Sequence, residues 1–381
     1  MTYANDKTSS AASTLRVNLG SRAYSIVVGD GLVTEAGRRM VDIISQRRVV
    51  VVTDATVAAL YLKALEGSLD EAGIEHSSIV LPAGEATKSF DRLLELTDRL
   101  LDDRIERTTT VVALGGGVIG DLAGFAASIV LRGVDVVQIP TTLLAQVDSS
   151  VGGKTGINTR HGKNLIGTFH QPILVLADVG TLATLPPRQL LAGYAETVKY
   201  GLTEDAAFFD WLERHGDLFC RGDKAIQTEA VIRACATKAA VVAEDERETG
   251  RRALLNFGHT FGHALEAECG YGERLLHGEA VALGMVMATT LSVRMGLCPS
   301  VDLDRTRRHL ETRGLRVRVG DLADSSWTAE RLLSHMMSDK KVRNRLPTFV
   351  LTRGIGKAFT TQDVDPDLLR SVVDAALSER P

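Results

Sequence analysis

The chain has 381 residues, of which 44% are hydrophobic and 24% charged, the composition of a globular protein long enough for two domains with separate cores. Its formal net charge of −4 excludes a global basic field that would attract nucleic acid or an anionic membrane. The sequence contains no apolar run of about 18 residues, so no membrane-spanning helix is expected.

The four cysteines form no CxxC pair, which argues against a metal ribbon and favours a reducing, cytoplasmic setting. Residues 1–13 lack the apolar core of a signal peptide and are expected to form a disordered leader. The expected partner is a small molecule. If it is anionic, a local cluster of Lys and Arg must hold it.

Strand and helix patterns alternate through the first half of the chain. Alternating apolar and polar residues predict an edge hairpin over 14–19 and 24–28. The β-branched run 48–54 predicts a strand buried on both faces, and helical spacing follows over 58–69. Further strands are predicted at 77–81, 109–114, 134–139 and 173–177. This alternation predicts a parallel sheet with crossover helices.

The strand signals stop around residues 185–188, and the patterns from there to about residue 340 are almost all helical. We place the domain boundary near residue 182. We therefore predict an α/β domain over 14–182 and a mainly helical domain over 183–381. Pro187 is expected in the first turn of the next helix. A short strand pair is expected at 348–352 and 357–360.

A glycine-rich turn, Gly115–Gly120, has the GxGxxG spacing between a predicted strand and a helix. Glycines let a backbone approach a pyrophosphate closely, and a helix N-terminus offers N–H groups to it, although a tight turn without ligand has the same pattern. No clear acidic residue ends the next strand, so Asp54 is the better candidate for binding a ribose. Thr141 and Thr142 end another strand and are candidates for phosphate or ribose contacts, or for simple turn residues.

The segment 148–167 is dense in Gly, Lys and Asn. Backbone N–H groups and ammonium groups together favour an anion-binding loop, and a solvent-exposed flexible loop is the alternative. It is not a Walker A motif, because the Gly-Gly-Lys154-Thr run lacks an upstream glycine at the required spacing.

One carboxylate and several imidazoles in the second half are candidate metal ligands: Glu196, His259, His263 and His277. One carboxylate with two imidazoles leaves coordination positions open, which suits a catalytic divalent ion. His259 and His263 are four residues apart on a predicted helix and so share a face. The alternatives are core, capping or turn histidines, and a surface ion pair between Glu196 and Lys199.

Lys238 lies on the apolar stripe of a predicted helix. A lysine there is buried at a cost unless it meets an anion or a polar ligand, or extends to the surface. Arg251 and Arg252, shortly before His259, would bring cations close to a metal.

These segments in this order resemble the 3-dehydroquinate synthase family of the sugar-phosphate cyclase superfamily. The resemblance covers nearly the whole chain after the leader. Its matching runs are 82–88, 115–121, 131–133, 138–142, 148–154, 162–164, 196–199, 248–263, 277–279 and 339–341.

The resemblance implies a Rossmann-like NAD-binding domain, a mainly helical metal domain, an active site in the cleft between them and a homodimer. It implies NAD⁺ with zinc, or cobalt as a possible substitute. The implied reaction converts 3-deoxy-D-arabino-heptulosonate 7-phosphate to 3-dehydroquinate and phosphate in the shikimate pathway. The implied steps are transient oxidation, phosphate β-elimination, re-reduction, ring opening and an intramolecular aldol closure.

Residue by residue, the resemblance implies metal ligands at Glu196, His259 and His277, and assigns His263 to phosphate binding and proton transfer. It implies further phosphate contacts at Lys154, Asn164 and either Lys340 or Lys341. It implies substrate contacts at Asp148, Lys199, Lys238, Arg252 and Asn256, with Arg132 as a residue that a dimer partner can contribute. It implies nucleotide contacts at Asp54, Glu85, Lys88, Gly116, Gly117, Asp121, Thr141, Thr142, Lys154, Lys163, Thr181 and Thr184.

Three other functions fit parts of this pattern. A 2-epi-5-epi-valiolone synthase would keep the nucleotide turn and the metal ligands, but Asn256, His263 and 339–341 follow the dehydroquinate pattern. An aminodehydroquinate synthase differs little in substrate and stays open. A glycerol-dehydrogenase-like polyol oxidoreductase needs no phosphate pocket, so the loop with Lys154 and Lys163 argues against it.

Overall fold

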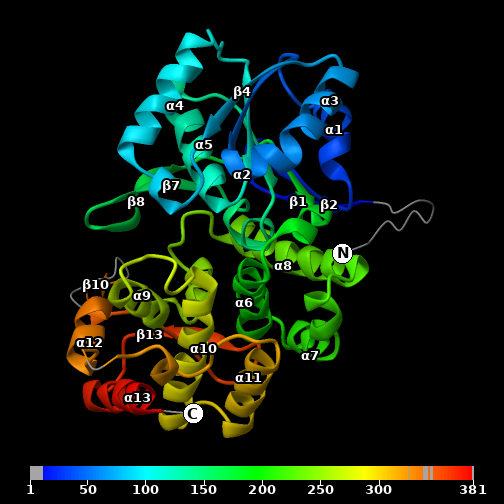
Figure 1. Cartoon of the computed structure of the whole chain (residues 1–381). Coiled ribbons are helices and arrows are strands. Elements are labelled where there is room, and N and C mark those ends of the chain that lie inside the picture. Colours follow the sequence, from blue (N-terminus) through cyan, green and yellow to red (C-terminus); the bar gives the residue numbers. More distant parts are fainter. Residues whose placement is uncertain (1–11, 325, 338–341, 344–345, 380–381) are drawn as a thin grey trace. The chain divides into compact units, whose positions relative to one another are not determined.

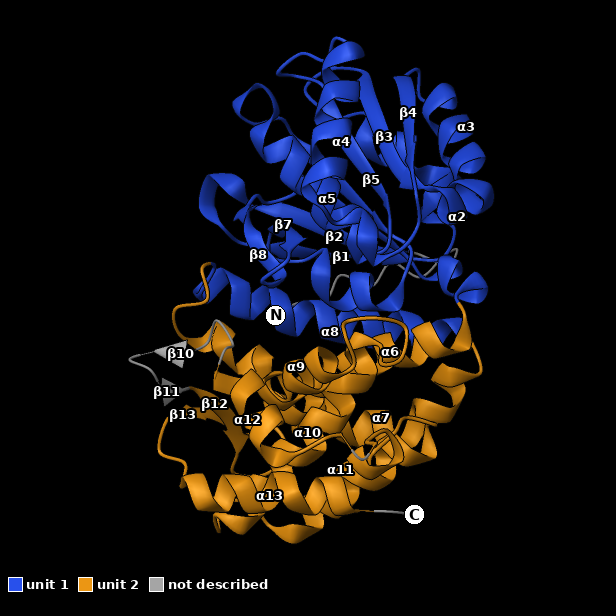
Figure 2. Cartoon of the chain, turned by 60° about the vertical axis from the view of Figure 1, so that its left-hand side comes forward, with its two compact units in different colours: residues 1–185, 224–246 blue, residues 186–223, 247–381 orange. Residues whose placement is uncertain are grey.

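The computed structural model describes residues 12–324, 326–337, 342–343 and 346–379. The chain forms two compact units, residues 1–185 with 224–246 and residues 186–223 with 247–381 (Figure 2). Most of the expected leader, together with Lys340 and Lys341, lies outside the described residues. Within the described part, no helix is long and apolar enough to cross a membrane.

The first unit is built on a seven-stranded sheet (Figure 1). Its strands, in spatial order, are β1 (Ser13–Val17), β2 (Tyr24–Gly29), β9 (Leu174–Asp178), β6 (Val136–Pro140), β5 (Thr110–Gly115), β3 (Arg48–Asp54) and β4 (Glu75–Leu81). Only the edge pair β1–β2 is antiparallel within this sheet, and every other neighbouring pair is parallel. The predicted fold class is confirmed, and so are the predicted edge hairpin and the central strands.

The valine run of β3 explains why this sheet is covered on both faces. Successive side chains of a strand point to opposite faces. Val49 and Val51 belong to the core cluster with helices α1 (Ala36–Met40) and α3 (Lys63–Glu71). Val50 and Val52 belong to the cluster with α4 (Phe90–Asp102) and α5 (Gly117–Ile129). All four are fully buried, and burying each contributes roughly 1.5 kcal/mol or more.

Short polar caps begin the helices that follow the strands. Asp54 ends β3 and accepts hydrogen bonds from the backbone N–H groups of Thr56 and Val57, which starts α2. Ser89 caps α4 through the N–H of Arg92. The α-helices of this unit are α1 (Ala36–Met40), α2 (Ala55–Val57), α3 (Lys63–Glu71), α4 (Phe90–Asp102), α5 (Gly117–Ile129) and α8 (Lys224–Glu244).

The compact units and the predicted boundary near residue 182 assign helix α8 to different domains. The prediction places it in the helical domain, whereas its contacts group it with the sheet (Figure 2). Its apolar stripe, with Val231, Ala234 and Cys235 fully buried, predicts burial but does not say against which element.

The segment predicted as a loop at 148–167 contains a hairpin that the sequence analysis missed. Strands β7 (Lys154–Thr159) and β8 (Gly162–Phe169) pair antiparallel, with an irregularity between Ile157 and Thr159. Gly, Lys and Asn disfavour strands, and only Gly156 and Ile157 in the hairpin are buried, so no clear alternation marks it. Part of the predicted flexible loop is therefore a paired ribbon.

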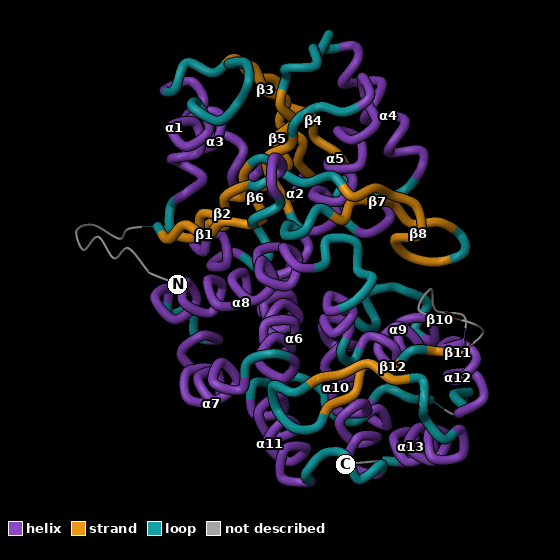
Figure 3. Tube along the Cα trace, turned by 180° about the vertical axis from the view of Figure 1, so that it is seen from behind, coloured by secondary structure: helices purple, strands orange, loops and turns teal. Residues whose placement is uncertain are grey.

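In its described residues the second unit is mainly helical, with two pairs of short antiparallel strands (Figure 3). Its α-helices are α6 (Pro187–Thr203), α7 (Ala206–Cys220), α9 (His259–Glu268), α10 (His277–Arg294), α11 (Ser300–Thr312), α12 (Ala329–Met337) and α13 (Pro366–Ser378). Its strands are β10 (Val342–Arg343), β11 (Leu346–Pro347), β12 (Phe349–Thr352) and β13 (Ala358–Thr361). The predicted start of α6 at Pro187 and the predicted pair β12–β13 are confirmed.

Helix α10 is the centre of this unit. Residues 278–289 of α10 are all buried, which is the pattern of a helix surrounded by other elements. It contacts α6, α9, α11 and α13 as well as β12. The N-terminal end of α10, where His277 stands, is therefore fixed by packing along the whole helix.

Candidate functional site

Three helices of the second unit bring the predicted metal ligands together. Glu196 comes from α6, His259 from the start of α9 and His277 from the start of α10. Their nearest donor atoms all lie within 4.8 Å of one another. The Nε2 atoms of His259 and His277 lie 3.6 and 3.4 Å from Glu196 Oε1.

These distances suit a divalent ion. Donors that are each about 2.0–2.1 Å from a tetrahedral zinc ion lie about 3.3–3.4 Å from one another. The three side chains reach nearly that spacing. One carboxylate oxygen and two imidazole nitrogens also form the ligand type that leaves a coordination position for substrate.

The close approach of the three helices depends on glycines. A Cβ at Gly278 of α10 would lie 1.9 Å from the carbonyl oxygen of Ala192 in α6. A Cβ at Gly284, two turns later, would lie 2.0 Å from the carbonyl oxygen of Gly258, the residue before α9. Because no side chain separates these backbones, the ligands on the three helices can converge.

Glu196 and Lys199 form an ion pair, but it is not the surface pair that their spacing alone suggested. Their side chains are 1% and 2% exposed. Lys199 Nζ contacts Glu196 Oε2, while Oε1 is the atom nearest the two histidines. Lys199 therefore compensates a buried carboxylate that would otherwise be costly to desolvate.

Hydrogen bonds orient both ligand imidazoles. Nδ1 of His259 lies 3.3 Å from the carbonyl oxygen of Phe257, which as acceptor requires the proton on Nδ1. Nδ1 of His277 lies 3.0 Å from Oε2 of Glu266. Burial lowers the pKa of His277, but the charges and hydrogen bonds of Glu266 and Glu196 outweigh it and raise the pKa to about 10. A bound cation would displace a proton from this ring.

Glu266 is a residue that the sequence analysis missed. It follows His259 by seven residues and His263 by three, so all three share one face of α9. That spacing was the available signal. His263, Glu266 and His277 also form a second group of three donors within 4.8 Å.

The first turn of α10 is held by a second carboxylate. Glu279 Oε2 accepts a hydrogen bond of 2.9 Å from the N–H of Leu276. Arg188 of α6 donates from Nε and Nη2 to the two oxygens of Glu279, both at 2.7 Å. This bidentate pair ties the start of α10 to α6, the two helices that carry His277 and Glu196.

The other predicted site residues of the second unit lie around the same helices. The His263 ring centroid is 5.4 Å from that of His259 and 5.9 Å from that of His277. Arg252 is only 2% exposed, and Asn256 donates from Nδ2 to Glu248 Oε1. The structure thus brings His263 to the ligand cluster and puts Arg252 and Asn256 in the turn that precedes α9.

The predicted nucleotide residues of the first unit gather at one edge of its sheet. Parallel strands end at the same edge, and ligands of open α/β sheets bind there. Asp54 ends β3, the glycine turn follows β5, and Thr141 and Thr142 follow β6. The N–H of Thr141 donates to the carbonyl oxygen of Gly115, which ties two of these strand ends together.

Two further predicted residues follow β9 at the same edge. Tyr61 donates its hydroxyl to the carbonyl oxygen of Thr181 and is also hydrogen-bonded to the Thr184 hydroxyl. Thr181 is buried, while Thr184 is exposed. Only Thr184 therefore offers its side chain at the surface.

Lys88 links two other predicted residues, Asp121 and Asn164. Its ammonium lies 2.6 Å from Asp121 Oδ2 and donates to Asn164 Oδ1 as well. Burial raises the pKa of Asp121, although the charge and hydrogen bond of Lys88 oppose the shift. Glu85 accepts a hydrogen bond of 2.7 Å from Asn158 of β7. These contacts attach the β7–β8 hairpin to the loop before α4.

Lys238 is buried, as its position on the apolar stripe predicts. It is 5% exposed, and its ammonium lies 2.8 Å from Asp148 Oδ1. The alternative, in which Lys238 extends to the surface, is wrong because an anionic partner lies within the unit. The structure thus pairs two predicted substrate contacts.

The remaining predicted residues of the first unit lie on or near the hairpin. Lys154 begins β7, Lys163 lies in β8, and Arg132 is exposed in a turn after α5. The backbone φ of Arg132 is 68°, in the left-handed region.

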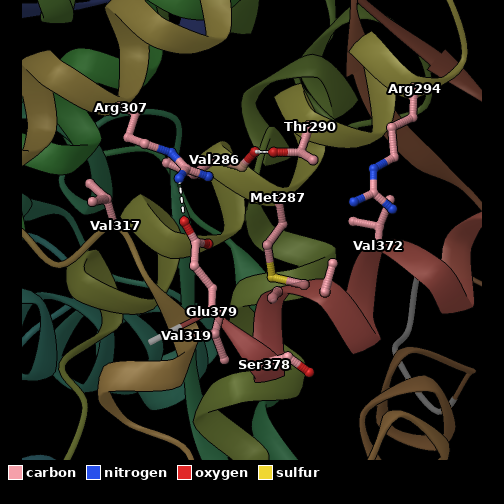
Figure 4. A pocket seen from close by; sticks show the side chains of 12 residues that line it. Val286, Met287, Thr290, Arg294, Arg307, Val317, Val319, Val372, Ser378 and Glu379 are labelled. Carbon is pink, nitrogen blue, oxygen red and sulfur yellow. Dashed lines mark hydrogen bonds and ion pairs between the residues drawn. The ribbon is translucent and has the colours of Figure 1, made fainter. Parts of the chain in front are cut away.

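A cavity of about 390 Å³ in the second unit contains none of the predicted residues (Figure 4). It is lined by apolar side chains of α10 and α13, with Arg294 and Arg307 at its border. Arg307 pairs with Glu379 there. The cavity is separate from the histidine cluster in its residues and is not assigned to the site.

Family models match two consecutive parts of the chain: 3-dehydroquinate synthase N-terminal over residues 78–192, and 3-dehydroquinate synthase C-terminal over residues 193–342. The 3-dehydroquinate synthase of Rhodospirillum rubrum is 61% identical over 96% of both chains.

Two solved structures share the fold closely. A 2-epi-5-epi-valiolone synthase from Streptomyces hygroscopicus, with NAD⁺ and Zn²⁺ bound, is 32% identical with a TM-score of 0.84, covering 93% of this chain and 96% of its own. A 2-deoxy-scyllo-inosose synthase, complexed with carbaglucose-6-phosphate, NAD⁺ and Co²⁺, is 25% identical with a TM-score of 0.84, covering 96% of this chain and all of its own. The consecutive family matches and the relative that is similar over nearly its full length lead to one conclusion: the chain belongs to the 3-dehydroquinate synthase family.

Proposed function

We propose that the chain converts 3-deoxy-D-arabino-heptulosonate 7-phosphate to 3-dehydroquinate and phosphate, with NAD⁺ and a divalent metal ion, zinc or cobalt. The observation that carries the proposal is the convergence of Glu196, His259 and His277 in a chain 61% identical to a 3-dehydroquinate synthase. The likeness to solved structures with NAD⁺ and Zn²⁺ or Co²⁺ supports the cofactors.

In this proposal the second unit holds the metal. Glu196, His259 and His277 are the ligands, and the bound ion supplies Lewis-acid stabilisation of a substrate hydroxyl that loses its proton. Lys199 pairs with Oε2 of Glu196, and Glu279 with Arg188 holds the first turn of α10. His263 binds the substrate phosphate and moves a proton at its imidazole. We assign this role to His263 because the other two histidines, His259 and His277, lie beside Glu196 as metal ligands.

The first unit binds the nucleotide in this proposal. The turn at Gly116 and Gly117 and the N-terminus of α5 hold the pyrophosphate, while Asp54 contacts a ribose. Glu85, Lys88, Asp121, Thr141, Thr142, Lys154, Lys163, Thr181 and Thr184 complete the proposed nucleotide contacts. NAD⁺ held by these residues would supply reversible hydride transfer, with no net redox change over the reaction.

The remaining proposed contacts are to the substrate. Lys238 carries a buried positive charge that Asp148 orients, and such a charge recognises a carboxylate or hydroxyl oxygen. Arg252 and Asn256 precede α9, and Lys154 with Asn164 lies on the hairpin. Arg132 is proposed to act on the partner's substrate.

Phosphate release without NADH accumulation tests the proposed reaction. We expect the purified chain, loaded with Zn²⁺ and NAD⁺, to release one phosphate per heptulosonate phosphate while absorbance at the NADH wavelength stays flat. NADH formed in proportion to turnover would instead identify a polyol dehydrogenase and reject the cyclase reaction.

Comparison of substrates decides between the cyclases. We expect heptulosonate phosphate to be preferred over sedoheptulose 7-phosphate in kcat/KM by on the order of 10⁴, because buried polar groups that meet the carboxylate are left unpaired without it. The aminodehydroquinate precursor is the third substrate to assay. A preference for sedoheptulose 7-phosphate would assign the chain to 2-epi-5-epi-valiolone synthesis.

We further propose that the chain is a cytoplasmic homodimer. The four cysteines are free thiols, which supports a reducing compartment. Large apolar side chains are exposed along β8, which supports a protein partner for that hairpin.

A further inference from the structure

We infer that Glu266 is a positioning residue of the metal site, holding the His277 imidazole so that Nε2 faces the ion. The inference rests on the proposed metal site and adds a residue that the sequence patterns do not single out. Glu266 lies on α9 and His277 on α10, so the contact also joins two of the three helices that carry ligands.

The two nitrogens of the His277 ring meet carboxylates on opposite sides. Nδ1 lies 3.0 Å from Glu266 Oε2, and Nε2 lies 3.4 Å from Glu196 Oε1. A carboxylate that accepts the Nδ1–H fixes both the tautomer and the rotation of the ring. The lone pair of Nε2 then points to the side where Glu196 and the second histidine lie.

Burial argues that Glu266 is more than a surface residue that happens to touch a histidine. The residue is 1% exposed, and a buried carboxylate is costly to desolvate unless a positive charge or hydrogen-bond donors compensate it. A cation held by the His277 ring would supply such compensation through the hydrogen bond. Carboxylate–histidine–metal arrangements of this kind are common around protein-bound zinc.

The competing role is direct coordination. His263, Glu266 and His277 also have donor atoms within 4.8 Å of one another. In that arrangement Nδ1 of His277, and not Nε2, would bind the ion, and Glu196 would not be a ligand. The two roles therefore predict different effects of removing Glu196.

The neighbouring Glu268 provides a matched control. It lies on the same helix, its side chain is also 1% exposed, and it is also paired. Its partners, however, are Arg331 at 2.7 Å and His335 at 3.0 Å, both on α12. Glu266→Gln and Glu268→Gln each replace a buried carboxylate of α9 with an amide of equal size, but only the first changes the partner of His277.

The test measures the affinity of the full-length apo-protein for Co²⁺ against a competing chelator, with the visible absorption bands of the bound ion as a second readout. We expect Glu266→Gln to raise the Kd for Co²⁺ by about 10- to 100-fold and to shift the bands. Glu268→Gln is expected to keep the wild-type Kd within about threefold and the wild-type bands. Glu196→Gln is expected to weaken binding more than Glu266→Gln, since it removes a ligand.

Other outcomes overturn the inference. Equal Co²⁺ affinity and equal bands in wild type and Glu266→Gln would remove the role of Glu266, and so would equal losses in Glu266→Gln and Glu268→Gln. A larger loss in Glu266→Gln than in Glu196→Gln would make Glu266 a direct ligand. If the wild type binds no Co²⁺, or if His259→Ala binds it as well as the wild type, the proposed metal site itself fails.

Discussion

At the scale of single residues, His309 shows how burial couples protonation to stability. It is 5% exposed on α11, and its Nε2 lies 3.0 Å from the Tyr194 hydroxyl. Burial, and then the nearby positive charge of Arg313, lower the pKa of His309 from 6.5 to about 4, although Asp217 opposes them. The native state therefore takes up a proton at lower pH than the unfolded chain does.

The sign of the resulting pH dependence follows from this difference. At pH values well above 6.5 the ring is neutral in both states. As the pH falls toward about 4, the unfolded chain binds the proton first, so the free energy of unfolding falls by up to about 3 kcal/mol. We expect His309→Gln, which stays neutral, to lose this part of the acid destabilisation in urea unfolding measured from pH 7 to 4.5.

The measurement is made with EDTA, so that acid release of metal does not contribute. The exposed His161 is the control, since His161→Gln is expected to keep the wild-type pH profile. If His309→Gln has the same pH profile as the wild type, His309 does not account for any of the acid destabilisation.

At the scale of elements, the site depends on how closely α6 and α10 pack. Gly278→Ala adds a Cβ that would lie 1.9 Å from the carbonyl oxygen of Ala192, a backbone atom that cannot turn away. We expect the helices to separate, the protein to lose about 1–3 kcal/mol of stability and the Kd for Zn²⁺ to rise by at least about tenfold. Chemical unfolding and a competitive zinc titration measure the two effects.

Gly272→Ala is the control, because no atom lies within 4 Å of a Cβ at that position. It should leave both measurements unchanged. Wild-type zinc affinity in Gly278→Ala would mean that the close contact of α6 and α10 is not needed to bring Glu196 and His277 together.

Some of these elements could be predicted from the sequence and others could not. The four valines of β3 predict a strand buried on both faces, because their pattern needs no knowledge of its neighbours. The hairpin of β7 and β8 was missed because its order comes from pairing and from bonds such as Lys88 with Asn164, which join distant residues. Helix α8 was predicted as a helix, but its apolar stripe does not identify the sheet as its partner.

The candidate site also contains residues whose role the sequence could predict and one whose role it could not. The residue types predict a metal site among Glu196, His259, His263 and His277. The resemblance to the 3-dehydroquinate synthase family implies Glu196, His259 and His277 as the ligands, and the structure brings these three together. The role of Glu266 could not be predicted, because it depends on the rotation of α9 against α10 and on which nitrogen of His277 faces which carboxylate. Such relations arise only when the helices pack.

At the scale of the whole molecule, the β8 strand exposes apolar side chains on both of its faces. Leu165, Ile166 and Phe169 are 45%, 38% and 42% exposed. Neighbouring residues of a strand point to opposite faces, so Leu165 and Ile166 are exposed on different sides of the hairpin. A hairpin that is apolar on both sides is expected to be covered by another chain.

We therefore expect sedimentation equilibrium of the wild type to give twice the chain mass of 41.0 kDa. The double variant Ile166→Lys, Phe169→Lys is expected to raise the dimer Kd by at least about 100-fold, because burying each unpaired charge in the interface costs several kcal/mol. Ile43→Lys is the control, since Ile43 is as exposed but lies just after α1, which covers the opposite face of the sheet from α4 and α5. Because Arg132 is proposed to act at the partner's substrate, the double variant is also expected to lose kcat when dilution separates its dimers. Added wild-type chain is not expected to restore the kcat of the double variant fully. A wild type that stays monomeric at micromolar concentration would contradict both the dimer and that role of Arg132, and β8 would then need another partner.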